Sequence, residues 1–268
     1  MKILSSDSLE GRKTGSAGNT KARQFIIDRL TQLNLLPLLN GNYVQPFTVT
    51  QSFGQVQAGQ GMNVLAVIEG KKKETIVISA HYDHLGMLGG TVYNGADDNA
   101  SGTAALLAIA EHFAKNKPSH RIILAFFDAE EMGLRGSAYF VNSINLQQEQ
   151  IMLNINMDMI SRSDNGELYA CGTAHYPQLK PLLEKVKVPE HISLRFGHDQ
   201  PGSGRNDWTG QSDHMNFHRM KIPFIYFGVE DHPDYHRPTD DFEKVNQSFY
   251  HRSVEVIIRA IRSFDNGL

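Results

Sequence analysis

Short apolar runs alternate with amphipathic stretches along the whole chain. Runs rich in β-branched and aromatic residues predict strands, several of them buried on both faces, at residues 63–69, 75–80, 121–127, 151–157 and 221–227. Apolar residues recur at helical spacing, and predict amphipathic helices, within residues 20–33, 101–115, 134–141 and 242–264. Strands that alternate with helices are typical of a sheet covered on both faces. We therefore predict an α/β protein, built as a single three-layer α/β/α domain around a central, mostly parallel mixed sheet.

Nothing in the sequence divides these elements into separate units. The 268 residues contain no Pro/Ser linker, low-complexity tract or internal repeat, so residues 1–268 are expected to form one domain. The chain has 26 Lys and Arg against 29 acidic residues and no basic block, which argues against nucleic acid as a partner. No apolar stretch approaches the roughly 18 residues that span a bilayer, so no membrane span is predicted. No obvious apolar stripe lies outside the core, which predicts a monomer.

The numbers of cysteines and histidines restrict the kind of metal site that the chain can form. Cys171 is the only cysteine, which excludes an intrachain disulfide and a cysteine-based zinc site. Histidines number 12, beside the 29 acidic residues. The ligands of any bound metal ion must therefore be imidazole nitrogens and carboxylate oxygens.

Side chains that can bind metals follow the predicted strands at the points where the strands end. They are His81, Asp83 and His84 after the second strand, Asp128, Glu130 and Glu131 after the third, Asp158 after the fourth, and Glu230, Asp231, His232 and His236 after the fifth. Asp97 and Asp98 come shortly before the helix at residues 101–115. Because ligands bind beyond the carboxyl ends of strands in open α/β sheets, we expect these side chains to share one cleft.

Carboxylates gathered in this cleft would repel one another unless protons or cations neutralise them. Two imidazoles among several carboxylates suit zinc, and less specifically manganese or cobalt. The predicted ligands are His81, Asp97, Glu131, Asp158 and His236. If Asp97 bridges two ions, each ion has three protein ligands and an open position for a shared water. We therefore predict two Zn²⁺ ions per chain.

Glu130 is the carboxylate without a ligand role in this arrangement. Adjacent residues cannot easily point at the same atom, so one of the pair Glu130 and Glu131 can bind metal while the other faces the water. Hydrolysis needs a base that takes a proton from water and returns it to the leaving group. Glu130 is the predicted general base.

Five segments, taken in order, resemble the cocatalytic zinc aminopeptidases, the metallopeptidase family that includes aminopeptidase Y, bacterial leucyl aminopeptidases and glutamate carboxypeptidase II. They are HYDH at residues 81–84, GADDNASG at 95–102, FDAEEMG at 127–133, NMD at 156–158 and YHRPTD at 235–240. DSLEGRKTGS at residues 7–16 and SDH at 212–214 are also similar to motifs of that family. The resemblance covers essentially the whole chain. It implies the zinc-dependent exopeptidase (phosphorylase/hydrolase-like) fold, without the protease-associated insert of some relatives.

The resemblance also implies a role for each site residue. His81 and Asp158 would hold one zinc ion, Glu131 and His236 the other, and Asp97 would bridge both, with Glu130 as the base. Asp83 would hydrogen-bond His81, and Asp240 would support His236, which fixes the tautomer of each imidazole. Many relatives have a cis peptide bond after the bridging aspartate, which here would join Asp97 to Asp98.

The implied activity is that of an aminopeptidase, which removes the N-terminal residue from peptides with a free amino terminus. Met159, Trp208 and Tyr235 are candidate walls of the pocket for the substrate side chain. The relatives are mostly exported, so we expect a periplasmic or secreted protein whose leader is absent from this chain. A cytoplasmic location is the alternative.

Three other functions stay open. A glutaminyl cyclase is a single-zinc acyltransferase on the same fold, but it usually carries Trp directly before the last histidine ligand, where this chain has Tyr235. A non-enzymatic module, as in the transferrin-receptor branch, would have lost ligands that are intact here. A zinc deacylase of small N-acyl compounds is disfavoured only weakly.

Overall fold

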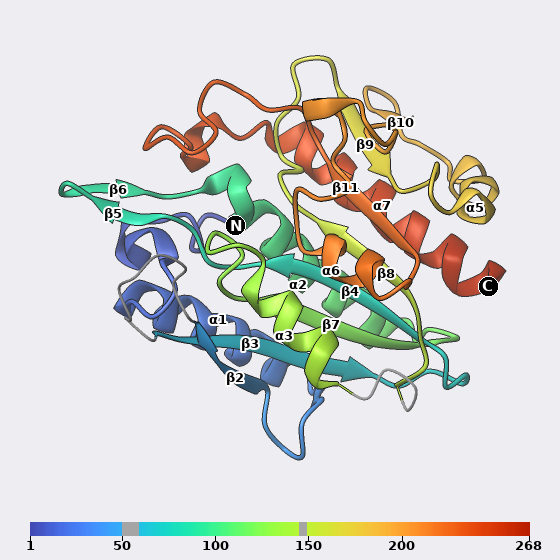
Figure 1. Cartoon of the computed structure of the whole chain (residues 1–268), viewed down its shortest axis with the longest axis horizontal. Coiled ribbons are helices and arrows are strands. Elements are labelled where there is room, and N and C mark those ends of the chain that lie inside the picture. The colour runs from blue at the N-terminus through green and yellow to red at the C-terminus, as the bar shows by residue number, and fades with distance from the viewer. Residues whose placement is uncertain (50–58, 145–148) are drawn as a thin grey trace.

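The computed structural model describes residues 1–49, 59–144 and 149–268, with a mixed β-sheet through its centre (Figure 1). The strands lie in the order β1-β3-β7-β4-β8-β11-β9-β10, and β2 also pairs with β3. Their bounds are β1 Leu36–Pro37, β2 Val44–Val49, β3 Gly59–Ile68, β4 Thr75–His81, β7 Arg121–Phe127, β8 Ile151–Met157, β9 Glu167–Cys171, β10 Ser193–Phe196 and β11 Phe224–Gly228. A separate ribbon is formed by β5 (Gly86–Leu88) and β6 (Thr91–Tyr93).

The centre of the sheet is parallel. Strands β7, β4, β8 and β11 run in the same direction, whereas β3 is antiparallel to β7 and β9 is antiparallel to β11. The mixed sheet is therefore as predicted, with parallel pairing at its centre and at the β9–β10 edge. His81 at the end of β4 is in register with Phe127 at the end of β7. This register brings the segments that follow the parallel strands to one edge.

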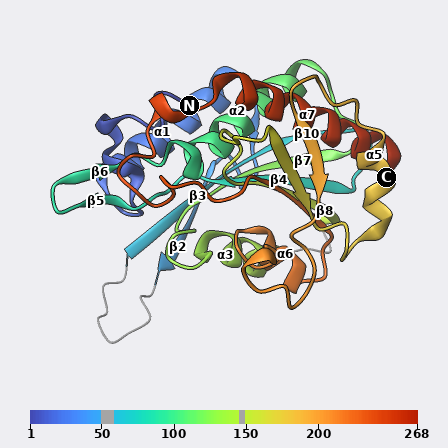
Figure 2. The ribbon, with the colours of Figure 1, turned by 90° about the horizontal axis from the view of Figure 1, so that it is seen from above.

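Helices cover both faces of the sheet, as the sequence predicts (Figure 2). On one face lie α1 (Ala17–Gln32), α2 (Gly102–Lys115) and α7 (Gln247–Gly267), and the short α5 (Lys180–Glu184) packs beside α7. On the other face lie α3 (Arg135–Ser143) and α6 (His214–Arg219). The three layers confirm the predicted α/β/α arrangement.

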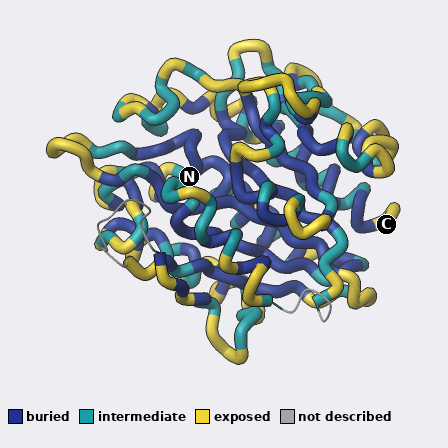
Figure 3. The backbone as a smooth tube through the Cα atoms, viewed as in Figure 1, coloured by how far each residue is buried: buried dark blue, intermediate teal, exposed yellow. Residues whose placement is uncertain are grey.

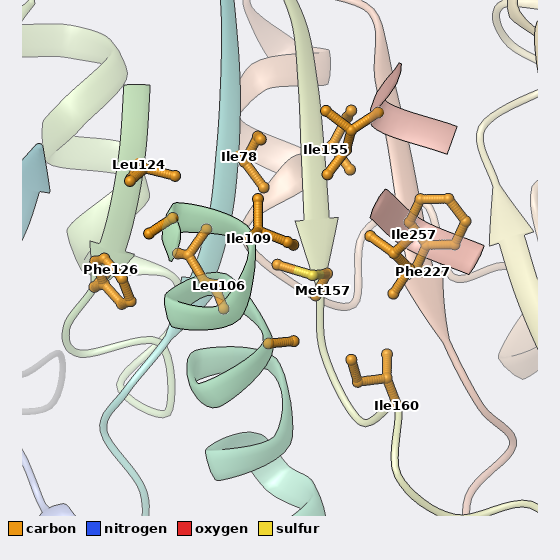
Figure 4. Packing of buried hydrophobic residues seen from close by; sticks show 14 of the residues in the cluster. Ile78, Leu106, Ile109, Leu124, Phe126, Ile155, Met157, Ile160, Phe227 and Ile257 are labelled. Atoms are coloured by element: carbon orange, nitrogen blue, oxygen red, sulfur yellow. The ribbon is translucent and has the colours of Figure 1, made fainter. Parts of the chain in front are cut away.

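Alternate residues of each central strand enter the two cores. Ile78 of β4 and Leu124 of β7 pack with Leu106 and Ile109 of α2, and Ile155 of β8 belongs to the same core (Figure 4). The second core lies between the sheet and helices α3 and α6. It includes Val77 and Ile123 of the strands, Phe140 of α3 and Phe217 of α6. Both faces of the central strands are buried, and β7 is apolar without interruption from Ile122 to Phe127. Figure 3 shows this buried centre inside exposed loops.

Several predicted elements differ from the observed ones at their starts. The strand predicted from residue 63 begins at Gly59, and the helix predicted from residue 20 begins at Ala17. The helix predicted from residue 242 begins at Gln247, because Phe242–Lys244 forms a separate 3₁₀ turn and the Asn246 side chain accepts the Phe249 amide as an N-cap. The strand predicted from residue 221 begins at Phe224, just after Pro223, which has no amide hydrogen for a sheet ladder. Within the described part of the chain, no helix has the length and apolarity needed to cross a membrane.

Candidate metal centre and active site

The carboxyl ends of β4 and β8 bring His81 and Asp158 together. His81 is the last residue of β4, and Asp158 directly follows the neighbouring parallel strand β8. The His81 Nε2 atom lies 3.3 Å from Asp158 Oδ1 and 3.4 Å from Asp98 Oδ1. These three side chains are buried and offer one nitrogen and two oxygens to a common point. They form the first donor group of the site.

A second donor group shares Asp98 with the first. The Asp98 Oδ2 atom lies 3.0 Å from Nε2 of His236, and the same nitrogen lies 3.4 Å from Glu131 Oε2. His84 also belongs to this group, since its Nδ1 atom is 2.7 Å from Glu131 Oε1. Asp98 thus lies between the two groups, with one oxygen facing each.

The structure places Asp98, and not the predicted Asp97, between the two donor groups. The Asp97 Oδ1 atom accepts hydrogen bonds from the amide and hydroxyl of Ser161 at 2.8 and 2.7 Å, and Oδ2 faces His232 Nε2 at 3.1 Å. Neighbouring side chains on this turn point in different directions, and the sequence alone does not show which aspartate faces the site. The cis peptide bond joins Asp98 to Asn99, one residue later than predicted but still directly after the shared aspartate.

Asp83 and Asp240, which were predicted to support His81 and His236, differ in how close they lie to those histidines. Asp83 lies beside His81, but the hydrogen bond to His81 Nδ1 involves the Asp83 carbonyl oxygen at 3.2 Å, whereas the carboxylate Oδ1 atom is 3.6 Å away. The Asp83 carboxylate also accepts the amide of Glu130 at 3.1 Å. Asp240 instead accepts the amides of Asp97 and Asp98 at 3.0 and 3.1 Å. It therefore supports the turn that carries Asp98, and among the described residues no hydrogen bond joins it to His236.

His84 is a site residue to which the sequence analysis assigned no role. Its side chain is fully buried against Glu131. A signal was present in the sequence, because His84 follows His81 by three residues at the same strand exit. Its contact is with the turn after β7, and this tertiary contact cannot be read from spacing.

The non-glycine residues with left-handed backbone conformations include three that belong to the proposed site or directly adjoin it. They are Ala129, Met159 and His236, with φ values of 59°, 57° and 54°. Ala129 precedes Glu130, and Met159 follows Asp158. Non-glycine residues adopt this region rarely, and such strain clusters at functional sites. The sharp turns here are therefore consistent with a backbone shaped to aim the neighbouring carboxylates.

The charges of the site strongly perturb its titrating groups. Burial alone would lower the pKa of His81, but the charges of Asp158 and Glu130 hold it well above its usual value. Burial also opposes protonation of His236, yet contacts with Asp98 and Glu131 raise its pKa to about 10. Burial raises the pKa of the Glu130 carboxyl well above its usual range. Protonated imidazoles thus compensate the buried carboxylates when no cation is bound.

The donor set fits zinc. Imidazole nitrogens and carboxylate oxygens are common zinc ligands. The ligand atoms of His81, Asp98 and Asp158 lie within 4.8 Å of one another, as do those of His84, Asp98 and Glu131. A divalent cation would take over the compensation that protons on His81 and His236 otherwise supply.

A cavity of about 260 Å³ opens onto both donor groups. Its lining contains the three predicted pocket residues, Met159, Trp208 and Tyr235, together with Glu130. Trp208 is held by His198, whose ring stacks on it at 3.7 Å between centroids. Neither lysine nor arginine occurs among the described residues that line the cavity. The cavity thus combines an acidic floor with partly aromatic walls.

Residues 63–261 match Peptidase family M28. Aminopeptidase YwaD of Bacillus subtilis (strain 168) is 29% identical over 206 residues, which cover 71% of this chain and 41% of that protein. The chain spans about half the length of the curated relatives that it matches.

Solved structures with the same fold include two kinds of enzyme. BSAP, a zinc aminopeptidase from Bacillus subtilis, superposes with a TM-score of 0.75 at 17% identity, covering 97% of this chain and 93% of that chain. A glutaminyl cyclase from Fimbriiglobus ruber gives a TM-score of 0.76 at 18% identity, covering 97% and 92%. At these identities the likeness shows the fold alone, and it confirms the zinc-exopeptidase fold predicted from the sequence.

Proposed function

Because the chain belongs to peptidase family M28, we propose that it is a metallo-aminopeptidase that removes the N-terminal residue from peptides. The observation that carries this proposal is the pair of donor groups that share Asp98 beside Glu130, at the floor of a cavity without lysine or arginine among its described lining residues. The aminopeptidase name of the relative YwaD supports the same activity.

Two zinc ions are part of the proposal. His81, Asp98 and Asp158 would hold the first, and Asp98, Glu131 and His236 the second, so that Asp98 replaces Asp97 as the bridging residue. Bound zinc supplies Lewis acidity, which polarises a carbonyl group and makes water more acidic. Asp83 would keep the His81 ring in place through its Nδ1 atom.

Glu130 is the proposed general base. Its carboxylate would take the proton of the attacking water and then donate it to the nitrogen of the departing peptide. Two features support this role. Its amide is fixed on Asp83, and its side chain lines the cavity next to both donor groups.

The charge of the cavity favours a substrate with a free amino terminus. Its described lining contains Asp231, a carboxylate outside the proposed ligand set, and neither lysine nor arginine, so it favours an ammonium group over a carboxylate. Recognition of a C-terminal carboxylate would call for a lysine or arginine there. Met159, Trp208 and Tyr235 would contact the side chain of the residue that is removed.

A glutaminyl cyclase is the second candidate, because proteins of that name share the fold. A panel of aminoacyl-anilides, N-acetylated controls and Gln-initiated peptides separates the candidates. Cleavage of the free anilides alone is the expected result. Cleavage of blocked substrates would favour the deacylase, and cyclisation without cleavage would favour the cyclase; either would overturn the aminopeptidase proposal.

The domain organisation, the oligomeric state and the location of the protein are also part of this proposal. Residues 1–268 would act as one catalytic domain, the protein would be a monomer, and it would be exported. Size-exclusion chromatography with light scattering tests the second, and a dimer at micromolar concentration would contradict it.

A further inference from the structure

We propose that His84 is a positioning residue that binds one oxygen of Glu131 and leaves only the other oxygen for the metal ion. This inference rests on the proposed two-zinc function. It assigns a task to a buried histidine that is not among the proposed ligands.

The two oxygens of Glu131 have different imidazole partners. Oε1 lies 2.7 Å from His84 Nδ1, whereas Oε2 lies 3.4 Å from His236 Nε2. The His84 side chain is fully buried, so solvent does not compete for this contact. The Glu131 carboxylate is therefore held between two rings, which come from the end of β4 and from the loop after β11.

The distances between the imidazole nitrogens and the carboxylate oxygens show which pairs form a hydrogen bond and which could bind the same metal ion. Atoms that bind one tetrahedral zinc ion at about 2.0–2.1 Å lie about 3.3 Å apart. The separations of His236 Nε2 from Asp98 Oδ2 and from Glu131 Oε2, 3.0 and 3.4 Å, are close to this value. The 2.7 Å between His84 and Glu131 is shorter and matches a charge-assisted hydrogen bond. His84 thus donates Nδ1–H to Glu131.

The other nitrogen of His84 agrees with this assignment. Nε2 is buried and has no hydrogen-bond partner in the described structure. A second ring hydrogen at Nε2 would be a buried donor without an acceptor, which is costly. The single hydrogen of the ring therefore belongs on Nδ1, where Glu131 accepts it.

Gly95 holds the His84 ring in its place. A Cβ atom at Gly95 would lie 2.5 Å from Cδ2 of His84, and the Gly95 φ of +53° suits glycine. The His84 amide donates to the Arg12 carbonyl at 3.4 Å, and the Arg12 side chain donates to the Gly95 carbonyl at 3.0 Å. The ring is thus fixed to the same loop that carries Asp98.

Two isosteric variants test the inference. In His84→Asn the amide nitrogen can occupy the place of Nδ1 and donate to Glu131, whereas in His84→Gln the amide reaches the place of Nε2. His84→Leu removes both nitrogens. The full chain is stripped of metal and titrated with Zn²⁺ against a competing chelator, with thermal melting to check folding.

We expect His84→Gln and His84→Leu to bind the second Zn²⁺ about 10–100-fold more weakly than wild type, with the first ion unchanged. His84→Asn should stay close to wild type. Equal weakening in His84→Asn and His84→Gln would overturn the inference, because a direct ligand or a packing role predicts it. Unchanged affinity in all variants would also overturn it. If His84→Leu does not fold, the Asn and Gln pair decides.

The same titration distinguishes failure of the inference from failure of the proposed function. Wild-type protein that binds two Zn²⁺ ions and cleaves aminoacyl-anilides, with His84 variants of equal affinity, would remove only the role of His84. Wild-type protein that binds at most one ion would remove the two-zinc function, and the inference with it.

Discussion

The carboxylate of Asp240 accepts the amide hydrogen of Asp98 at 3.1 Å, across 142 residues of sequence. The same carboxylate accepts the amide of Asp97 at 3.0 Å. Two buried backbone donors are thereby satisfied, and the turn before α2 is held with the Asp98 side chain toward the donor groups. The choice between the two aspartates therefore depends on a tertiary contact.

The pair Asp97 and Asp98 provides a direct test of the placement. Asp98→Asn should abolish binding of both zinc ions at micromolar concentration, because each donor group loses its shared carboxylate. Asp97→Asn should still bind two ions, since the Asp97 side chain is engaged with Ser161 and His232. Metal content after dialysis measures both. The reverse result would restore Asp97 as the bridging residue.

Glu130→Gln should lower kcat by about 10²–10⁴-fold while two zinc ions remain bound, because the amide cannot accept the proton of the attacking water. Glu131→Gln is the matched control, since it changes the neighbouring carboxylate and should weaken metal binding instead. Anilide hydrolysis and metal analysis of both variants check this. A Glu130→Gln enzyme with substantial turnover would exclude Glu130 as the base.

Arg12 should matter for stability although it touches no proposed ligand side chain. Its buried guanidinium donates to the carbonyl oxygens of Leu4, Tyr82, Asn94 and Gly95, and so joins the N-terminal turn to two loops of the site. Arg12→Lys leaves some of these carbonyls unpaired and should lower the free energy of unfolding by about 3 kcal/mol. Chemical denaturation measures it. The exposed neighbour Lys13→Met should change stability by about 0.5 kcal/mol or less, and equal effects would contradict the prediction.

His214 should make the protein less stable in acid. Burial lowers its pKa to about 3, whereas in the unfolded chain it is near 6.5. The folded state therefore binds fewer protons between these values, and stability present above pH 6.5 is lost as the pH falls, at about 1.4 kcal/mol per pH unit.

The variant His214→Gln isolates this contribution. The glutamine amide can still donate to the Trp208 carbonyl, as His214 Nε2 does at 2.9 Å, but it does not titrate. The free energy of unfolding is measured for both metal-free proteins at pH 7 and at pH 4.5. Its decrease from pH 7 to pH 4.5 should be smaller for His214→Gln than for wild type. Parallel losses in the two proteins would show that His214 does not cause the acid sensitivity.

Local patterns determined the layers and the chemistry of this protein. Apolar runs such as residues 121–127 are short for a helix and have the length of a strand buried on both faces. Because these runs alternate with amphipathic segments, the sequence predicted a sheet between two layers of helices. A single cysteine restricted any metal site to nitrogen and oxygen ligands. The rule that ligands bind beyond strand ends predicted that His81, Glu131, Asp158 and His236 share one cleft, and the structure places His81 beside Asp158 and His236 beside Glu131.

Tertiary structure decided which of several similar side chains faces the site. Asp97 and Asp98 are chemically identical neighbours. Their amides both donate to the Asp240 carboxylate, and the Asp97 carboxylate accepts from Ser161, so contacts with distant residues orient them. His84 acquires its role from contact with Glu131, which lies 47 residues away in sequence. Periodicity reports which face of an element is buried, because burial repeats along the chain. The direction of a single side chain on an irregular turn depends on distant partners, and the sequence pattern does not contain them.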